Sequence, residues 1–288
     1  MKKIFAILII LFFITGSLIA QDYGSYDAGS RLDRVINSSE EFTLQDSYYI
    51  GRAVAAQILS NYRLYNDKAR VTRYLNMICG ALTVNSSPLN VFNGFHVMIL
   101  DSQIPNAFST PGGHIFLTRG LIDLASSEDM LAAVIAHEIA HVQLKHGLDE
   151  IKQDRLVKSL GSESERLARI TEQGLNNNER SQVFSVSVNE LVQTLFTRGY
   201  SRLQEFEADN AAVTLLAAAG YSTNGLPEML KKLQKIQNDS ISSSISSTHP
   251  SSAERLANIE KQANFSRAKD TSASRKNRFL RITGNSAN

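Results

Sequence analysis

The sequence is poor in cysteine. Cys79 is the only cysteine in 288 residues, so the chain cannot form an internal disulfide bond. If the protein is exported, its fold must therefore be held by its apolar core and by any metal that it binds. The apolar fraction of 43% is ordinary for a globular protein and is sufficient for a sizeable core. Cys79 lies in an apolar-periodic stretch and is expected to be a small buried side chain.

The charged residues show no excess of one sign. The chain has 30 Lys and Arg residues against 28 Asp and Glu residues. Loss of Lys2 and Lys3 with a signal peptide would remove two basic residues and leave 28 of each sign. This balance gives no indication of a nucleic-acid partner.

The N-terminal apolar run is too short to be an ordinary membrane span. Ile4–Ile14 falls below the ~20 residues that a spanning helix needs. Two lysines precede it and small residues follow it up to Ala20, which predicts a secretory signal peptide over residues 1–20. The alternative is an uncleaved membrane anchor. No cysteine follows the run, so a lipid anchor is not expected, and we expect an exported protein of the periplasm or cell envelope.

One stretch, Met130–Gly147, combines an apolar helix with groups that are costly to bury. Its apolar side chains are distributed all around the helix, which is typical of a helix in the centre of a domain. The same stretch carries His137, Glu138 and His141. Buried polar groups need partners, and a metal ion is one such partner.

The spacing of these three residues is that of a zinc hydrolase motif. His137 and His141 are four residues apart, about one helical turn, so both imidazoles can reach one ion at about 2 Å. Glu138 is offset by about 100° and would lie beside the ion, where a general base is needed. The alternative is a pair of core histidines that hydrogen-bond to each other. His146, near the end of this helix, is expected to cap free carbonyl groups rather than to bind metal.

The remaining pattern predicts a mostly helical α+β fold. Gly80 and the turn at Ser86-Ser87-Pro88 are expected to end the second helix, a Pro-Gly-Gly turn to form the hairpin, and Ser127 to cap the motif helix. The expected elements are helices over residues 47–65, 67–82, 121–124 and 211–219, two helices between 148 and 198, a strand over 95–100 and a hairpin over 106–120.

A zinc site needs at least one further protein ligand. Glu205 and Asp209 are four residues apart and lead into an Ala-rich helix that can pack closely against another helix. Glu205 is the candidate third ligand, and Asp209 is the candidate acceptor that orients a ligand histidine. The alternative is an ordinary acidic first turn of a helix, and Glu207 is the local competitor.

The C-terminal part contains one more histidine of interest. His249 follows a Ser-rich segment, residues 239–248, and precedes Pro250, a setting that by itself favours a surface loop. From residue 266 the chain is polar and of mixed charge, which predicts a flexible tail or a weak contact site. The expected division is a signal peptide (1–20), a lead-in segment (21–40), a domain that carries the zinc hydrolase motif (41–265) and a tail (266–288).

Four blocks of residues together resemble a known enzyme family. They are similar to the zinc metallopeptidases that include the CAAX prenyl endopeptidases and the HtpX-type heat-shock proteases. Within that family they are most similar to the exported branch that degrades or assists misassembled outer-membrane proteins. The blocks are Asn106-Ala107-Phe108 with Pro111-Gly112-Gly113 and Thr118–Leu121; His137-Glu138-x-x-His141; Ser201-Arg202 with Glu205-Phe206-x-Ala208-Asp209; and Thr248-His249-Pro250 with Arg255.

The resemblance implies a zincin-like (gluzincin) core, with a small sheet beside the motif helix. It implies Glu205 as the third zinc ligand, Asp209 as the acceptor that supports a ligand histidine, and His249 as a group near the metal. It also implies that the strand edge at Asn106, Ala107 and Phe108 holds substrate by strand addition. The membrane-spanning helices of some branches and the C-terminal repeats of the longest exported relatives are not expected here, nor are roles that depend on those repeats.

We therefore expect an endopeptidase with one Zn²⁺ per chain that cleaves unfolded or misassembled envelope proteins. Glu138 is the expected general base, and His249 and Arg255 are candidates for stabilising the oxyanion. Expected partners are loosely folded polypeptides, with peripheral contact to membrane or envelope proteins. The alternative is a zinc-containing, chaperone-like assembly factor with little proteolysis, and a third hypothesis is zinc hydrolysis of a non-peptide substrate.

Overall fold

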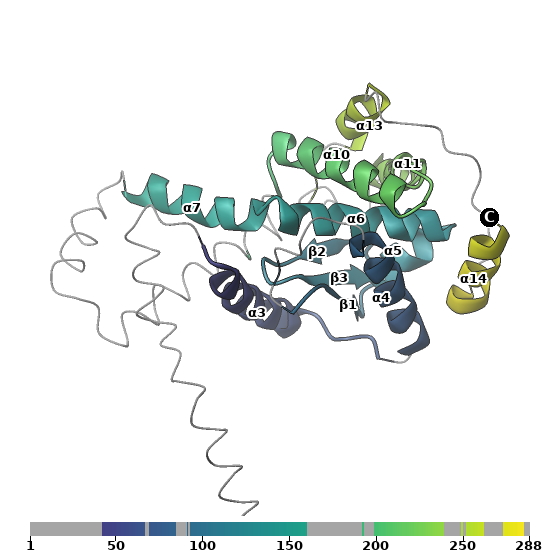
Figure 1. Ribbon diagram of the computed structural model, residues 1–288, viewed down its shortest axis with the longest axis horizontal. Coiled ribbons are helices and arrows are strands. Elements are labelled where there is room, and N and C mark those ends of the chain that lie inside the picture. The colour runs from purple at the N-terminus through teal and green to yellow at the C-terminus, as the bar shows by residue number, and fades with distance from the viewer. Residues whose placement is uncertain are drawn as a thin grey trace, which may run out of the picture.

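The computed structural model describes residues 42–66, 69–84, 91, 93–159, 192, 199–238, 249, 252–261 and 273–284 (Figure 1). The predicted signal peptide, the lead-in segment, the break expected around residues 174–178 and the Ser-rich segment 239–248 lie outside these residues. Among the described helices, none has both the length and the apolarity that crossing a membrane requires.

A small sheet of three strands forms one layer of the molecule. The strands are β1 (His96–Leu100), β2 (Ala107–Ser109) and β3 (His114–Thr118), in the order β1-β3-β2. β2 and β3 pair antiparallel, which confirms the predicted hairpin, whereas β1 and β3 are parallel. Gly113 in the turn has a φ of 84°, and a Cβ there would lie 2.7 Å from the Gly94 carbonyl oxygen, so the turn requires glycine. β2 is left at the edge of the sheet.

Helices cover this sheet, which confirms the predicted mostly helical α+β class (Figure 1). The contacts place α6 at the centre, packed against β2 on one side and against α10 and α11 on the other. The described helices are α3 (Leu44–Asn61), α4 (Ala69–Thr83), α5 (Arg119–Leu124), α6 (Glu128–Gln143), α7 (His146–Ser159), α10 (Arg202–Ala218), α11 (Gly225–Asn238), α13 (Ser252–Glu260) and α14 (Ala273–Thr283).

The motif helix α6 is buried along nearly its whole length. Every residue from Glu128 to Val142 is buried, as its continuous apolar surface predicts. Ser127 caps the helix by accepting a hydrogen bond from the Met130 backbone N–H at 3.2 Å, which confirms the predicted N-cap. Cys79 is also buried, with 2% of its surface exposed.

Two predicted helix ends differ from the structure. Gly80 lies inside α4, which continues to Thr83, because this glycine does not have the positive φ of a helix-ending residue. α3 ends at Asn61 rather than at Tyr65. The chain is already extended at Tyr62, and the Tyr65 N–H donates to the Ile99 carbonyl at 2.8 Å, so these residues pair with β1 instead.

The segment from residue 266, predicted to be a flexible tail or a weak contact site, contains a helix at residues 273–283. They form α14, which packs against α4 and α6 with Phe279 only 1% exposed. In Figure 1 this helix lies at the right-hand side of the fold. The elements that it contacts, α4 and α6, are far from it in the sequence. Arg275 and Arg278 of this helix contact acidic groups of the domain, and sequence alone does not show these distant partners.

Glu128 is the main polar contact of α14. Its carboxylate is fully buried and accepts hydrogen bonds from Arg278 Nε at 2.7 Å and from the Tyr74 hydroxyl at 2.8 Å. The Tyr221 hydroxyl donates to the same carboxylate at 3.3 Å. Next to it, Arg275 Nε lies 3.3 Å from the buried Asp129 carboxylate. Two acidic residues in the first turn of α6, Glu128 and Asp129, therefore bind the C-terminal helix to α6.

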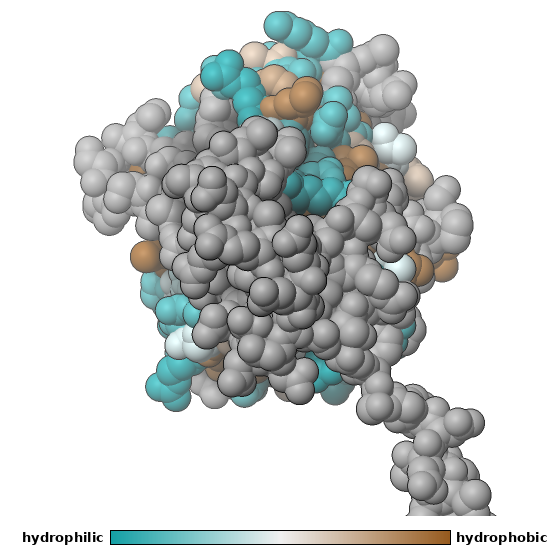
Figure 2. All heavy atoms as spheres, turned by 90° about the vertical axis from the view of Figure 1, so that its left-hand side faces the viewer, coloured by the Kyte–Doolittle hydropathy of each residue, from teal (hydrophilic) through white to brown (hydrophobic). Residues whose placement is uncertain are grey.

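Figure 2 shows the molecular face that lies on the left of Figure 1. It contains a recess in which the visible atoms are hydrophilic, with hydrophobic atoms close to it. Polar groups therefore gather in a hollow on this face rather than only on its outer surface.

We predict that Arg278→Ala lowers the free energy of unfolding by about 1–3 kcal/mol, because it leaves the buried Glu128 carboxylate without its cation. Chemical denaturation followed by circular dichroism measures the change. Lys276→Ala, at an exposed position of the same helix, is the matched control and should change stability by less than about 0.5 kcal/mol. Equal stability of the two variants would contradict the role given to Arg278.

Candidate metal centre

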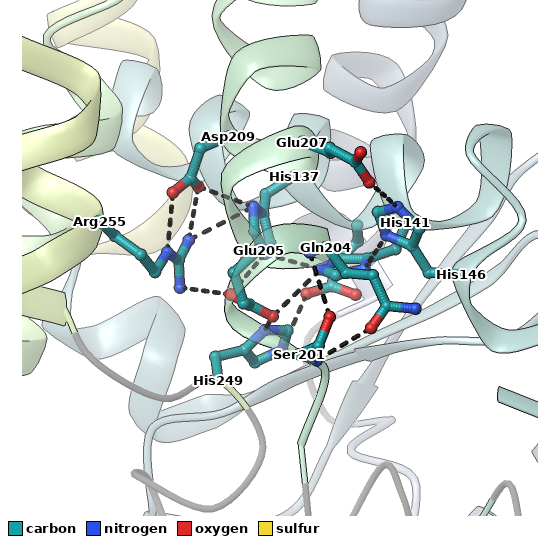
Figure 3. Close-up of polar contacts among 11 residues, drawn as sticks. His137, His141, His146, Ser201, Gln204, Glu205, Glu207, Asp209, His249 and Arg255 are labelled. Carbon is teal, nitrogen blue, oxygen red and sulfur yellow. Dashed lines mark hydrogen bonds and ion pairs between the residues drawn. The ribbon is translucent and has the colours of Figure 1, made fainter. Parts of the chain in front are cut away.

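Four side chains from three parts of the chain meet at one point. Potential ligand atoms of His137, His141, Glu205 and His249 all lie within 4.8 Å of one another (Figure 3). The Nε2 atoms of His137 and His141 are 3.0 Å apart. The Glu205 carboxylate oxygens lie 3.6 Å from the first of these nitrogens and 3.4 Å from the second. Two nitrogens and a carboxylate oxygen converging in this way form a donor set that suits a divalent metal.

Helix packing brings the predicted residues together. His137 and His141 point to the same side of α6, as their spacing predicts, and α10 packs along this side. Ser201 and Gln204 form a capping box that sets the start of α10, so Glu205 lies in its first turn. Glu205 and Asp209 are both 0% exposed, in the interface with α6. Glu207 points away and its side chain is 49% exposed, so it is not part of the cluster.

His137 is held by a carboxylate behind it. Its Nδ1 lies 3.0 Å from Asp209 Oδ1, while its Nε2 faces the cluster. If Nδ1 carries the proton and donates it to Asp209, Nε2 is left with a free lone pair for a metal. Asp209 thus lies beside a candidate ligand histidine, and its role as an orienting acceptor stays a prediction.

Arg255 is fully engaged with the acidic side chains of α10. Its Nε and Nη2 donate to the two Asp209 oxygens at 2.9 and 2.7 Å, and its Nη1 lies 2.9 Å from Glu205 Oε2. The side chain is 5% exposed. This geometry favours a positioning role for Arg255, and its predicted contribution to oxyanion stabilisation remains a prediction.

His146 does not cap α6, and the prediction of that role is wrong. α6 ends before Lys145, whose φ of 60° turns the chain, and His146 begins α7 and lies 2% exposed. Its Nδ1 is 2.9 Å from the Nδ1 of His141, and its Nε2 is 3.3 Å from Glu207 Oε2. With His141 Nε2 facing the cluster, its Nδ1–H can donate to His146, which in turn donates to Glu207.

The electrostatics keep the two motif histidines neutral. Burial, reinforced for His137 by the neighbouring Arg255 guanidinium, lowers the pKa of each imidazole to about 4. Burial would raise the pKa of Glu205, but His249 and Arg255 hold it well below its usual value. At neutral pH the cluster therefore presents two neutral imidazoles and one carboxylate, the protonation states that bind a metal.

His249 and Glu138 lie on the open side of this cluster. His249 Nδ1 is 2.8 Å from Glu205 Oε1, and its Nε2 is 3.5 Å from Glu138 Oε1. Burial lowers the pKa of His249, but the Glu205 and Glu138 carboxylates together outweigh this effect and the net shift is upward. Among the described residues, Glu138 Oε2 has no hydrogen-bond partner although it is buried. A buried carboxylate oxygen without a partner is costly, and it can accept a proton or a water hydrogen bond.

β2 lies beside these groups as predicted for a substrate-binding edge. Asn106 and Ala107 line the same cavity as His137, Glu138 and His249. Phe108 instead packs in the core, 1% exposed, with its ring 5.9 Å from that of Tyr62. Binding of substrate at this edge remains a prediction for all three residues.

Sequence comparison identifies the family of these motifs. The family model for peptidase family M48 matches residues 69–263. The chain belongs to peptidase family M48. The matched region covers the sheet, α6, α10, α11 and α13 and therefore every residue of the cluster, whereas α14 lies beyond it. The fold and the predicted family agree.

Several relatives are similar to this chain over most of its length. It is 25% identical to the mitochondrial metalloendopeptidase OMA1 of Schizosaccharomyces pombe, over 80% of this chain and 63% of that protein. It is 27% identical to the beta-barrel assembly-enhancing protease of Yersinia pestis, over 93% of this chain and 53% of that protein. It is 30% identical to the metalloprotease LoiP of Escherichia coli, over 64% of this chain and 68% of that protein. The chain thus spans less than two thirds of the first two relatives.

His146 and Tyr200 are site residues that the sequence interpretation missed. The Tyr200 ring stacks on His141 with centroids 4.1 Å apart and planes at 18°. The signal for His146 was present, because a third histidine follows His141 after five residues. Its contact depends on the turn at Lys145, which a continuous helical pattern did not reveal.

We predict that His146→Ala weakens Zn²⁺ binding about 10- to 100-fold, because His141 loses the acceptor that fixes its ring. Competition with a chromophoric chelator measures the dissociation constant. His96→Ala, at an exposed histidine in the sheet, is the matched control and should leave binding unchanged. An unchanged dissociation constant for His146→Ala would show that the contact does not orient His141.

Proposed function

We propose that this M48 metallopeptidase is a zinc-dependent endopeptidase that cleaves unfolded or misassembled proteins of the cell envelope. The observation that carries the proposal is the convergence of His137, His141 and Glu205 beside a buried, partly unpartnered Glu138 carboxylate. Two imidazole nitrogens and one carboxylate oxygen are the protein ligands of a catalytic zinc site that keeps a position open for water. The residues thus fit one Zn²⁺ per chain.

When bound, Zn²⁺ would lower the pKa of a coordinated water to about 7 and polarise the scissile carbonyl. Glu138 takes the proton of the attacking water and passes it to the leaving amine. Asp209 and Arg255 hold the ligands on α6 and α10 in place, through the contacts to His137 and Glu205. His249, on the open side, is placed to hydrogen-bond the developing oxyanion once its own contact to Glu205 gives way.

An envelope location is part of this proposal. The lysine-led apolar segment at residues 1–20 supports export, and similarity to a protein named beta-barrel assembly-enhancing protease supports an envelope role. The position of β2 at the edge of the sheet favours substrates with an exposed backbone. Strand addition needs an unfolded segment and depends little on the side chains of that segment. Peripheral contact with membrane or envelope proteins belongs to the same proposal.

We predict that Glu138→Gln retains Zn²⁺ but lowers cleavage of an unfolded test protein such as reduced casein about 10²- to 10⁴-fold. The amide keeps the shape of the carboxylate but cannot accept the proton. Zinc content and the initial rate of peptide-bond cleavage are measured together. Glu260→Gln, at an exposed position on α13, is the control and should cleave like the parent. Undiminished cleavage by Glu138→Gln would exclude Glu138 as the base.

Removal of the metal should also destabilise the fold. At free Zn²⁺ about 1,000-fold above its dissociation constant, binding to the native state adds about 4 kcal/mol to stability. We therefore predict a lower unfolding temperature and no cleavage after chelation, with recovery of both when Zn²⁺ is added back. Differential scanning calorimetry and the casein assay check this, and identical behaviour with and without chelator would contradict a zinc enzyme.

A zinc-containing assembly factor with little proteolysis is the second candidate. It is favoured by the position of His249. A potential ligand atom of this side chain lies within 4.8 Å of those of His137, His141 and Glu205 and could occupy the fourth coordination position of the metal. His249→Ala distinguishes the two functions. A protease inhibited by His249 should cleave faster after the substitution, and a protease assisted by it should cleave more slowly. A protein that binds unfolded chains but never cleaves them in either form is an assembly factor.

A further inference from the structure

The ring of Tyr200 lies over the ring of His141, one of the proposed metal ligands. The two centroids are 4.1 Å apart and the planes are at 18°. Paired aromatic rings are usually about 4.5–7 Å apart, so this contact is close. The rings of His137, His146 and His249 also lie near His141, but at angles of 81°, 73° and 55°. Of these four neighbours, Tyr200 is the one that covers a face of the imidazole.

The polar contacts of His141 are made by its two nitrogens. Nε2 faces the metal cluster, 3.0 Å from Nε2 of His137, and Nδ1 lies 2.9 Å from Nδ1 of His146. The χ2 torsion of histidine has broad minima, so rotation about the Cβ–Cγ bond costs little by itself. This rotation would carry Nε2 out of the ring plane and away from the cluster. A ring packed on one face blocks rotation toward that side by direct contact.

Tyr200 is itself held firmly enough to give this support. Its side chain is 5% exposed and belongs to the core cluster that contains Phe108 and Phe116. The next residue, Ser201, is the N-cap of α10, and its capping box fixes the backbone at this point. The short segment that leads to the candidate ligand Glu205 therefore also carries the ring that covers His141.

The two motif histidines are supported in different ways. His137 is contacted by charged groups, because Asp209 lies 3.0 Å from its Nδ1 and Arg255 binds that carboxylate. His141 instead has an uncharged histidine at its Nδ1 and a tyrosine ring on its face. Packing therefore has to supply for His141 the restraint that ionic contacts supply for His137.

The contact should strengthen when a metal binds. The face of an aromatic ring carries negative potential and attracts positive charge. The buried His141 is neutral at pH 7. Coordination of its Nε2 to a divalent cation would draw electron density from the imidazole and make the ring more positive. The Tyr200 ring would then stabilise the metal-bound state more than the metal-free state.

We propose that Tyr200 is a positioning residue of the metal centre, whose ring holds His141 in the orientation that binds Zn²⁺. The inference rests on the proposed function, because it concerns the same metal. It assigns the role to the ring of Tyr200 and not to its hydroxyl group. Tyr200 and His141 also line one crevice, of about 220 Å³ including space open to solvent, which a smaller side chain at position 200 would enlarge.

The test compares Tyr200→Phe, which keeps the ring, with Tyr200→Leu, which removes it, both in the full-length protein. Competition with a chromophoric chelator measures the dissociation constant for Zn²⁺. We expect Tyr200→Leu to raise this constant about 3- to 10-fold, the effect of losing one aromatic pair, and Tyr200→Phe to keep it within about twofold. An equal increase in both variants would assign the effect to the hydroxyl group and overturn the inference.

Phe116→Leu is the matched control, because it removes a buried ring of β3 from the same core cluster. We expect both leucine variants to unfold at a lower temperature than the parent, but only Tyr200→Leu to bind Zn²⁺ more weakly. If the two leucine variants bind Zn²⁺ equally well, Tyr200 is an ordinary core residue and the proposed role is wrong.

Substitution of Co²⁺ for Zn²⁺ gives a signal that a purely structural role would not change. Co²⁺ binds the same kinds of nitrogen and oxygen donors, and its visible absorption depends on the geometry of its ligands. We expect Tyr200→Leu to shift and broaden this absorption, and Tyr200→Phe and Phe116→Leu to match the parent. In zinc-saturated protein, Tyr200→Leu should lower kcat for a quenched fluorescent peptide at least about threefold and leave KM within about twofold.

The outcomes separate this inference from the proposed function. A parent protein that binds Zn²⁺ but never cleaves casein contradicts the proposed function, while the dissociation constants and the Co²⁺ absorption still decide the role of Tyr200. A cleaving Tyr200→Leu variant with the Zn²⁺ affinity, Co²⁺ absorption and kcat of the parent contradicts the role of Tyr200 but not the peptidase.

Discussion

The structure depends on the pairing of charges that are buried between α6 and α10. Glu205 and Asp209 are fully buried on α10, and unpaired carboxylates would be strongly unfavourable there. Arg255 on α13 binds both of them, while His137 on α6 contacts both from the other side. Because these contacts join three helices, the packing of the domain and the geometry of the metal centre have the same cause. A metal cation would complete the pairing, since Glu205 faces two imidazoles that are neutral at pH 7.

The same principle operates at the opposite end of α6. Glu128 and Asp129, at its N-terminus, are buried and are contacted by Arg278 and Arg275 of α14. The helix that carries both motif histidines is therefore fixed by ionic contacts at each end and by apolar packing between them. Rigid support of this kind keeps ligands within the narrow range of distances that a metal site needs. α14 lies outside the region that matches the family model, residues 69–263, and still contributes this support.

Local patterns predicted much of this architecture. The hairpin with Gly113, the cap at Ser127 and the buried α6 all follow from residue spacing and turn chemistry, and the structure confirms them. Spacing alone also predicts that His137 and His141 lie on one helix face. The prediction that Glu205 joins them came from spacing and was strengthened by the family resemblance. What the sequence could not show were contacts between distant segments, such as those of Arg278 with Glu128. The turn at Lys145 was missed for a related reason, since a non-glycine residue with positive φ has no reliable sequence signal.

The account rests on one divalent ion bound by two histidines of α6 and one glutamate of α10. Anomalous X-ray diffraction from crystals of the zinc-loaded protein, recorded on both sides of the zinc absorption edge, locates that ion directly. The account predicts one peak per chain about 2 Å from Nε2 of His137, Nε2 of His141 and a carboxylate oxygen of Glu205. A peak at another place, or none at these residues in protein that contains stoichiometric zinc, would contradict it.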